Sequence, residues 1–262
     1  MSMEKPIRLT PSLREKVWGR TRLAPWFQDS ERPIGEVWYL ADRQLPLLVK
    51  LIFTSQRLSV QVHPDSKTEM WHILDAEPGA AIALGFRQPI TRQRLLESAR
   101  TGEVEQLINW FPVKPGETYF TPAHTVHAIG GGIVLCEIQQ NSDVTWRLWD
   151  WGRPRELHVE EAVAIADLGV HPGAARATPI FEGCDELVRC RYFVTELVRL
   201  APGAPHTPAP ERCQIWMCVE GRGAIEGEPF RAGEVWLFSE GGEQPAVRAE
   251  TKARFLRTFV PR

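Results

Sequence analysis

Short runs of β-branched, aromatic and aliphatic residues recur along the chain, and turn residues separate them. Examples in the first half are IGEVWYLA, LLVKLIF, AAIALGF and GIVLCEIQQ. Such closely spaced runs are typical of a β-sandwich or β-barrel rather than of alternating strands and helices. The chain is therefore expected to be all-β, and its 262 residues, 43% of them hydrophobic, can form a large core.

Two segments depart from this pattern and predict short helices. In the segment 91–110, apolar residues such as Leu95, Ala99 and Val104 recur at helical spacing, and Gly102 is placed to break the helix. The segment 157–169 predicts a second helix that ends at Gly169. The helices are thus expected to be additions to a β scaffold.

A stretch rich in Pro, Gly and Ala, GVHPGAARATPI, is typical of a linker and predicts two units, residues 1–175 and 176–262. The units are weakly similar: EMWHILDAEPGAAI aligns with QIWMCVEGRGAI, and VKPGETYFTP with FRAGEVWLFS, which suggests a duplication. In this alignment Gln214 replaces Glu69, and no histidine follows Gly233. A polar site is therefore expected in the first unit only.

Composition narrows the partners and the compartment. The formal net charge is −2 and no apolar run reaches about 18 residues, so neither nucleic acid nor a membrane is an expected partner. The start MSMEKPIRLT lacks the apolar segment of a signal peptide, which predicts a cytoplasmic protein. The 5 cysteines show no CxxC spacing, which favours reduced thiols over disulfides or a cysteine zinc site.

Polar side chains interrupt the apolar run LSVQVHPDSKTEMWHIL. In a strand, Gln61 and His63 share one face with Ser59, and a tight connection after His63 would bring Glu69 back beside it. His127 follows a Gly-x5-Pro turn in PGETYFTPAHTVHAIG. One amide oxygen, two imidazoles and one carboxylate suit zinc or another divalent first-row ion. The alternative is that each is a hydrogen-bonded core or rim residue.

The spacings Q-x-H-x5-E and G-x5-P-x4-H resemble the two cupin motifs, with Gln61 where many cupins carry a histidine. More specifically, motifs in order from residue 16 to about 160 resemble those of type I mannose-6-phosphate isomerases of the compact bacterial kind: KVWGR, IGEVW, LPLLVKL, LSVQVHPD, KTEMWHIL, TPAHTVHAI and EIQQNSDVTWRLWDWGR. The resemblance implies a jelly-roll cupin barrel with a metal site, followed by a smaller cupin-like unit that lacks metal ligands.

The resemblance also implies an activity, the interconversion of mannose 6-phosphate and fructose 6-phosphate through an enediol, with one zinc or other divalent ion per chain. The implied metal ligands are Gln61, His63, Glu69 and His127. The implied catalytic residues are Glu137, Arg147, Lys67 and Asp143, with Glu137 as the leading acid/base candidate. The implied substrate-binding residues are Lys50, Trp18, Glu36 and Ser59. The alternative for Lys50, Lys67 and Arg147 is that they are solvated surface charges. That alternative fits poorly for Lys50, which interrupts the apolar run LLVKLIF.

Two features depart from the family pattern. Only three residues separate His63 from Lys67, and His124 stands where a glycine is usual. A glycine there would allow a positive φ, so His124 is expected to strain the turn or to be neutral. Two other functions stay open: a non-catalytic cupin that senses a sugar phosphate, and an isomerase of unphosphorylated sugar. The oligomeric state is open as well.

Overall fold

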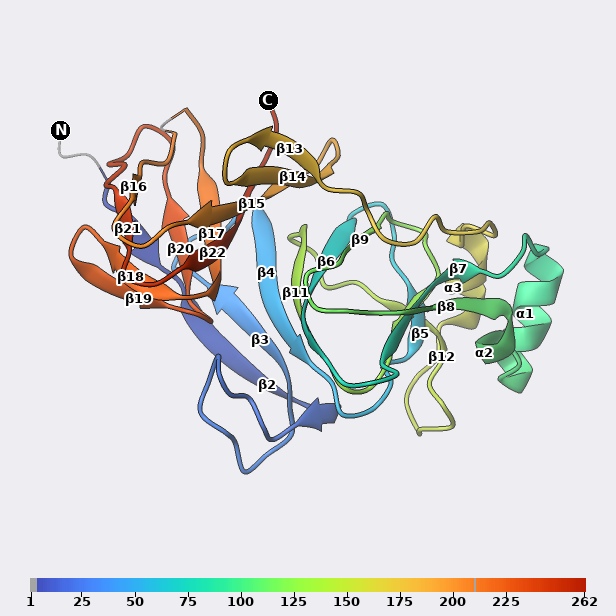
Figure 1. Ribbon diagram of the computed structural model, residues 1–262. Coiled ribbons are helices and arrows are strands. Elements are labelled where there is room, and N and C mark those ends of the chain that lie inside the picture. The colour runs from blue at the N-terminus through green and yellow to red at the C-terminus, as the bar shows by residue number, and fades with distance from the viewer. Residues whose placement is uncertain (1–3, 210) are drawn as a thin grey trace.

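The protein consists of two β-barrel units side by side, which a computed structural model describes for residues 4–209 and 211–262 (Figure 1). All strand pairings among these residues are antiparallel. The expectation of an all-β fold with few helices is confirmed. Within the described residues, no helix has the length and apolar character needed to cross a membrane.

Two sheets form the first unit, coloured blue to green in Figure 1. The six-stranded sheet has the order β2 (Thr10–Arg20), β3 (Ile34–Leu40), β4 (Leu47–Phe53), β11 (Ile133–Gln140), β6 (Glu69–Ala76) and β9 (Thr118–Thr121). The five-stranded sheet has the order β12 (Trp146–Trp149), β5 (Val60–Val62), β10 (His127–Ile129), β7 (Ala81–Phe86) and β8 (Ile108–Pro112). One buried cluster contains Trp71 and Ile73 from the first sheet and Ile82 from the second, so the two sheets pack face to face.

The second unit, orange to red in Figure 1, repeats this plan on a smaller scale. Its seven-stranded sheet has the order β1 (Ile7–Arg8), β20 (Val235–Phe238), β17 (Gln214–Glu220), β22 (Ala253–Phe259), β15 (Val194–Leu200), β14 (Cys184–Arg189) and β13 (Thr178–Phe181). The four-stranded sheet has the order β16 (Pro205–His206), β21 (Val247–Ala249), β18 (Arg222–Ile225) and β19 (Glu228–Arg231). The strand β1, which precedes the strands of the first unit in the sequence, thus pairs with β20 at the edge of the second unit.

The two units share one hydrophobic core. A single buried cluster contains Val37 and Leu51 of the first unit together with Met217 and Leu256 of the second. The buried Tyr39 on β3 donates its hydroxyl hydrogen to the carbonyl of Gly233 at 2.5 Å. Burial of this apolar surface fixes one unit against the other.

The predicted helices are present but shorter than expected. The helix α1 (Arg92–Thr101) begins after Thr91, whose hydroxyl accepts from the Arg94 N–H, and ends at Gly102 with φ 83°, as predicted. After the short α2 (Val104–Leu107) the chain becomes strand β8, so the prediction of helix to residue 110 is wrong. Pairing of β8 with β7 overrides the local helical periodicity there.

The second helix, α3 (Val159–Ile165), ends at Ala166 rather than at Gly169. The carbonyl of Gly169 instead accepts from the Phe86 N–H, which ties the segment after the helix to β7. The cap at Gly169 is therefore a wrong prediction. Together α1, α2 and α3 cover the outer end of the first unit (Figure 1).

Candidate metal and active site

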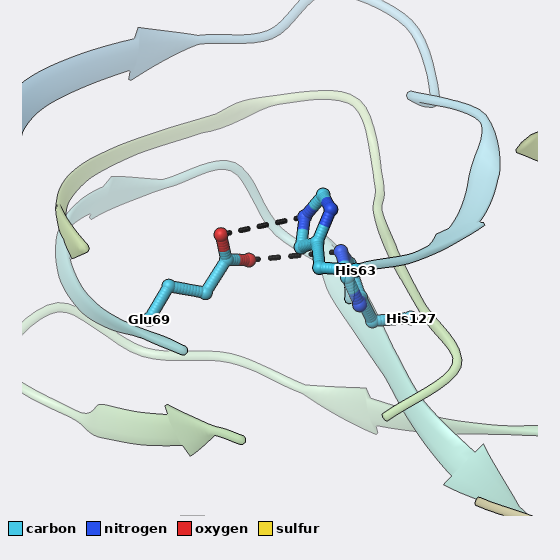
Figure 2. Close-up of side chains that lie close together, drawn as sticks. All are labelled: His63, Glu69 and His127. Atoms are coloured by element: carbon cyan, nitrogen blue, oxygen red, sulfur yellow. Dashed lines mark ion pairs between the residues drawn. The ribbon is translucent and has the colours of Figure 1, made fainter. Parts of the chain in front are cut away.

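Three side chains from three parts of the first barrel converge at its interior (Figure 2). His63 lies directly after β5, Glu69 begins β6, and His127 begins β10. His63 Nε2 is 3.4 Å from Glu69 Oε2, and His127 Nε2 is 3.6 Å from Glu69 Oε1. All three residues are at most 2% exposed. Ligand atoms of all three lie within 4.8 Å of one another, a spacing that a single cation can bridge.

Backbone carbonyls orient the two imidazoles. His63 Nδ1 lies 3.0 Å from the Val144 carbonyl, and His127 Nδ1 lies 2.8 Å from the Thr125 carbonyl. Because a carbonyl only accepts, each Nδ1 carries the hydrogen and each Nε2 keeps a lone pair that faces Glu69. Burial lowers the pKa of His127 to about 4 and that of His63 well below its ordinary value. Both rings are therefore neutral, the form that binds metal.

Glu69 has a cation nearby but lacks hydrogen bonds. Lys67 Nζ lies 3.4 Å from Oε2, yet neither carboxylate oxygen has a hydrogen-bond partner among the described residues, an arrangement that is costly for a buried ionisable group. Burial raises the pKa of Glu69 to about 7. A divalent cation between this carboxylate and the two Nε2 lone pairs would satisfy all three groups, so these side chains fit a metal ion.

Gln61 completes the group. On β5 the neighbours Val60 and Val62 are fully buried against the helical end of the unit, which leaves Gln61 facing the interior. Its amide lies 3.2 Å from His127 Nε2 and accepts from the Ser59 hydroxyl at 3.1 Å. A half-turn of the amide exchanges its oxygen and nitrogen, so Gln61 can present an oxygen to an ion.

Lys67 stands beside these ligands. Its ammonium is 2.9 Å from His63 Nε2 and 3.4 Å from Glu69 Oε2, and the residue is 4% exposed. A fixed positive charge in a buried site attracts negative charge on a substrate because the low local dielectric strengthens the interaction.

Glu137 lies on the neighbouring strand β11 and is held by two other strands. Its Oε1 accepts from Lys50 Nζ on β4 at 2.9 Å, and its Oε2 accepts from Trp71 Nε1 on β6 at 3.2 Å. Burial alone would raise the pKa of Glu137, but Lys50 and Lys67 outweigh it and bring that pKa below its ordinary value. Glu137 is thus an ionised carboxylate at neutral pH, a state that can accept a proton.

A cavity of about 280 Å³ opens beside this cluster. Nine of the twelve residues predicted from the sequence line it: Trp18, Glu36, Lys50, Ser59, Gln61, Lys67, Glu137, Asp143 and Arg147. The other three are the His63, Glu69 and His127 cluster, which Gln61 and Lys67 contact. The structure therefore brings all twelve residues to one place, and their individual roles remain predictions.

Four further residues line the cavity that the sequence analysis did not single out as site residues: the cations Arg14, Lys16 and Arg155, and the indole of Trp38. On β2, Arg14, Lys16 and Trp18 are two residues apart and so share the inner face of the sheet. This alternation in LREKVWG was the signal available in the sequence. The charges of Arg14 and Lys16 concealed it, because such residues usually lie on a solvated face.

His124 has φ 73°, in the left-handed region expected for a position where glycine is usual. Its Nε2 lies 3.2 Å from Asp65 Oδ1, outside the group of ligands. A separate cavity of about 380 Å³ lies beside Phe120 and His171. There His171 uses both ring nitrogens in contacts with backbone groups of Phe120 and Gly173, so that cavity offers no free ligand of this type.

Two antiparallel barrels in tandem, with a buried histidine and carboxylate cluster inside the first, define a cupin with a candidate metal site. A scan against models of protein families finds no match. Mannose-6-phosphate isomerase ManA of Bacillus subtilis is 29% identical over 90% of this chain and 94% of its own length. GmuF of the same organism, named as a probable mannose-6-phosphate isomerase, is 30% identical over 62% of this chain and 69% of its own length. The chain belongs to the mannose-6-phosphate isomerase family.

Solved structures agree on the fold. The crystal structure of mannose 6-phosphate isomerase from Bacillus subtilis superposes with a TM-score of 0.87 at 24% identity, and the match covers 98% of this chain and all of the other. A zinc-bound mannose 6-phosphate isomerase superposes with a TM-score of 0.78 at 16% identity. That match covers 98% of this chain and 100% of the other. The prediction of a cupin fold of this family is confirmed.

Proposed function

We propose that this protein is a metal-dependent aldose–ketose isomerase that interconverts mannose 6-phosphate and fructose 6-phosphate. The observation that carries the proposal is the buried cluster of His63, Glu69 and His127, with Lys67 and Glu137 beside it. Family membership agrees with this assignment, since the relatives named above bear the name of that activity.

Gln61, His63, Glu69 and His127 would hold one divalent ion, for which we propose zinc. When bound, the ion supplies stabilisation for negative charge that develops on the sugar oxygens. Lys67 supports the same charge with its buried ammonium. Backbone carbonyls of Val144 and Thr125 fix the two imidazoles of this set in place.

Glu137 is the proposed acid/base. It takes the proton from C2 of open-chain mannose 6-phosphate, the C–H electrons form the C1=C2 double bond, and the carbonyl electrons move to O1, which takes up a proton to give the enediol. The C2 hydroxyl then gives up its proton, its electrons form the ketone, and the electrons of the double bond take the proton from Glu137 at C1. Three features suit Glu137 to this step: it is ionised, it is 5% exposed, and Lys50 and Trp71 fix both carboxylate oxygens. Exclusion of water protects the enediol during the transfer.

Arg147 is the proposed ligand of the phosphate. It lines the cavity, and no carboxylate among residues 4–209 and 211–262 lies within ion-pair distance of it. Its Nε is buried without a hydrogen-bond partner. A guanidinium with free donors can bind a phosphate in a bidentate manner. Lys16 and Arg155 at the rim, although paired with Glu36 and Asp150, add to the positive field.

Chemistry is proposed for the first unit, residues 1–175, and a structural role for the second, residues 176–262. We also propose a cytoplasmic location, because all five cysteines are free and a reducing compartment keeps buried thiols in that state. Sugar phosphate is the proposed partner, and neither nucleic acid nor membrane is part of the proposal.

Metal content and isomerase activity, measured on one preparation, test the proposal. Chelation is expected to remove about one equivalent of metal per chain and to abolish turnover, and added zinc is expected to restore both. Full activity in metal-free protein would end the proposal. A protein that binds the metal and the sugar phosphate without turnover would be a sensor instead.

Replacement of Arg147 tests whether this residue binds the phosphate of the substrate. Arg147→Leu is expected to lower kcat/KM on mannose 6-phosphate by about a hundredfold and to change turnover of free mannose little, because only the phosphorylated sugar uses that contact. Equal losses on both sugars would indicate that the phosphate binds elsewhere or that free sugar is the substrate.

A further inference from the structure

Trp38 lies between two cations at the floor of the cavity. The Arg14 guanidinium from β2 is 3.6 Å from the ring centroid, and Lys50 Nζ from β4 is 4.5 Å from it. Since β3, which carries Trp38, runs between β2 and β4, the two cations approach the ring from opposite neighbouring strands. The indole Nε1 donates to Glu36 Oε2 at 2.8 Å. Three contacts thus fix the orientation of one ring.

Trp38 also belongs to a row of cross-strand neighbours that contains the proposed acid/base, Glu137. Trp38 is paired with Lys50 across β3 and β4, Lys50 with Glu137 across β4 and β11, and Glu137 with Trp71 across β11 and β6. Directly opposite side chains of an antiparallel sheet touch on the same face. The position of the Trp38 ring is therefore transmitted to Glu137 through one ammonium group.

Lys50 has few other constraints on its position. It is 4% exposed, and its ammonium donates to Glu137 Oε1 at 2.9 Å and to Gln139 Oε1 at 2.5 Å. Both acceptors lie on β11, so the indole is the contact that limits movement of the ammonium toward β3. A desolvated ammonium over the face of tryptophan is held more strongly than one in water.

We propose that Trp38 is a positioning residue for proton transfer: its ring holds Lys50 against Glu137 and so fixes the carboxylate that moves the proton. The proposal rests on the proposed isomerase function. Glu36 and Arg14 hold the ring in turn, which gives both residues a place in the same unit. Trp38 itself is separated from Glu137 by Lys50 and acts through it.

Kinetics of Trp38→Met test this role, because methionine keeps much of the volume and removes the aromatic face. We expect kcat to fall about thirtyfold, the equivalent of about 2 kcal/mol for a desolvated cation–π contact, with KM changed less than twofold. The primary isotope effect on C2-deuterated mannose 6-phosphate is expected to increase, because a less well placed carboxylate makes proton transfer slower. Metal content is expected to equal that of the wild type.

Two further variants isolate the ring. Trp38→Phe keeps an aromatic face, although it is smaller than the indole and loses the N–H to Glu36, so its kcat is expected within about threefold of the wild type. Trp110→Leu is the matched control, since Trp110 is also half-buried and lies against Trp151, with ring centroids 6.3 Å apart, rather than in the lining of the cavity. Its kcat and isotope effect are expected to be unchanged.

Several results would overturn the inference. Wild-type kcat in Trp38→Met, or an equal loss in Trp38→Phe, would show that the ring face is not the contact that matters. A loss confined to KM would make Trp38 a substrate-binding residue. If Trp38→Met does not fold, Arg14→Met, which frees one side of the ring, must lower kcat and raise the isotope effect, and unchanged values would refute the role. An inactive wild type would instead refute the proposed function.

Discussion

Each barrel has an ion pair at the equivalent position of its larger sheet, and the positive and negative residues are exchanged between the two barrels. In the first, Lys50 on β4 and Trp71 on β6 flank Glu137 on β11. In the second, Glu196 on β15 and Trp216 on β17 flank Arg257 on β22. The first pair is buried, and in the second Glu196 is buried while the Arg257 side chain is 13% exposed. The scaffold therefore accepts either polarity, and only the first polarity places a carboxylate at the position of the proposed base.

The ligand positions differ more strongly. Gln214, where the first barrel has Glu69, accepts from the Trp216 indole at 3.2 Å and so is satisfied without an ion. Val247 begins β21, the counterpart of the strand that His127 begins, and is fully buried. Val247 packs in one buried cluster with Trp216 and Phe255, whose ring centroids are 5.4 Å apart. Among the described residues, three candidate ligands gather only in the first barrel, whereas the second retains a single buried imidazole nitrogen without a partner, His206 Nε2. This difference supports the proposal that the chemistry belongs to the first barrel.

The largest expected effect comes from removal of a ligand. Glu69→Ala and His127→Ala are each expected to empty the metal site and to lower kcat by at least about a thousandfold, the loss that several kcal/mol of charge stabilisation implies. The folded state is expected to survive, because the cluster lies inside a barrel held by other contacts. Metal content and isomerase rate on the same samples measure both quantities.

Gln214→Ala is the matched change in the second barrel. It is expected to leave metal content and kcat at wild-type values, with a small loss of stability from the broken bond to Trp216. Loss of metal in this variant would mean that the second barrel contributes to the site and that the contrast between the barrels is wrong.

Because each barrel has an equivalent ion pair, the same Glu→Gln substitution can be made in both barrels and compared. Glu137→Gln is expected to lower kcat by about a hundredfold or more, the usual contribution of a general acid/base. Glu196→Gln breaks the equivalent pair with Arg257 and is expected to leave kcat unchanged. Both variants leave a buried cation unpaired, so each is expected to lose about 3 kcal/mol of unfolding free energy. Urea denaturation and steady-state kinetics separate the two effects, and a large kcat loss in Glu196→Gln would contradict the assignment.

A smaller effect concerns pH. His72 is fully buried at the position that Met217 occupies in the second barrel, and burial lowers its pKa from 6.5 to about 4. Between these values the unfolded chain binds a proton that the folded protein does not bind. Stability is therefore lost as the pH falls from about 6.5 to about 4, by up to about 3 kcal/mol from this group.

His72→Met introduces the residue of the second barrel and is expected to reduce the proton uptake on unfolding by about one in that range. Urea titrations from pH 7 to pH 4 measure the slope for both proteins. The bond from His72 to the Thr118 hydroxyl at 2.9 Å is lost in the variant, so absolute stability at pH 7 is not the readout. An unchanged slope would show that other groups, such as His63 and His127, account for the pH dependence.

The fold and the polar cluster followed from local patterns, whereas contacts across strands did not. Alternation within single strands placed Gln61 and His63 on the inner face, and the ordered motifs supplied the distant His127. The pairing of Glu196 with Arg257 depends on register between strands far apart in sequence, which no local pattern encodes. For the same reason residues 108–110 were predicted to be helical, since only their pairing with β7 makes them part of a strand. Trp38 was visible as a motif residue, but its contact with Lys50 was not.

The smallest effect concerns the turn that precedes β10. His124 has φ 73°, whereas in the longer equivalent turn of the second barrel the residue at positive φ is Gly241, with φ 66°. A side chain in this region costs about 1 kcal/mol relative to glycine, and the contact of His124 with the exposed Asp65 returns little of it.

His124→Gly is therefore expected to raise the unfolding free energy by about 0.5 kcal/mol, after the extra flexibility of glycine in the unfolded chain is subtracted. Gly241→Ala, whose new methyl group would touch nothing, is expected to lower it by about 1 kcal/mol. Urea midpoints at constant slope measure both changes, and a loss of stability in His124→Gly would mean that the imidazole holds the turn more strongly than its backbone strains it.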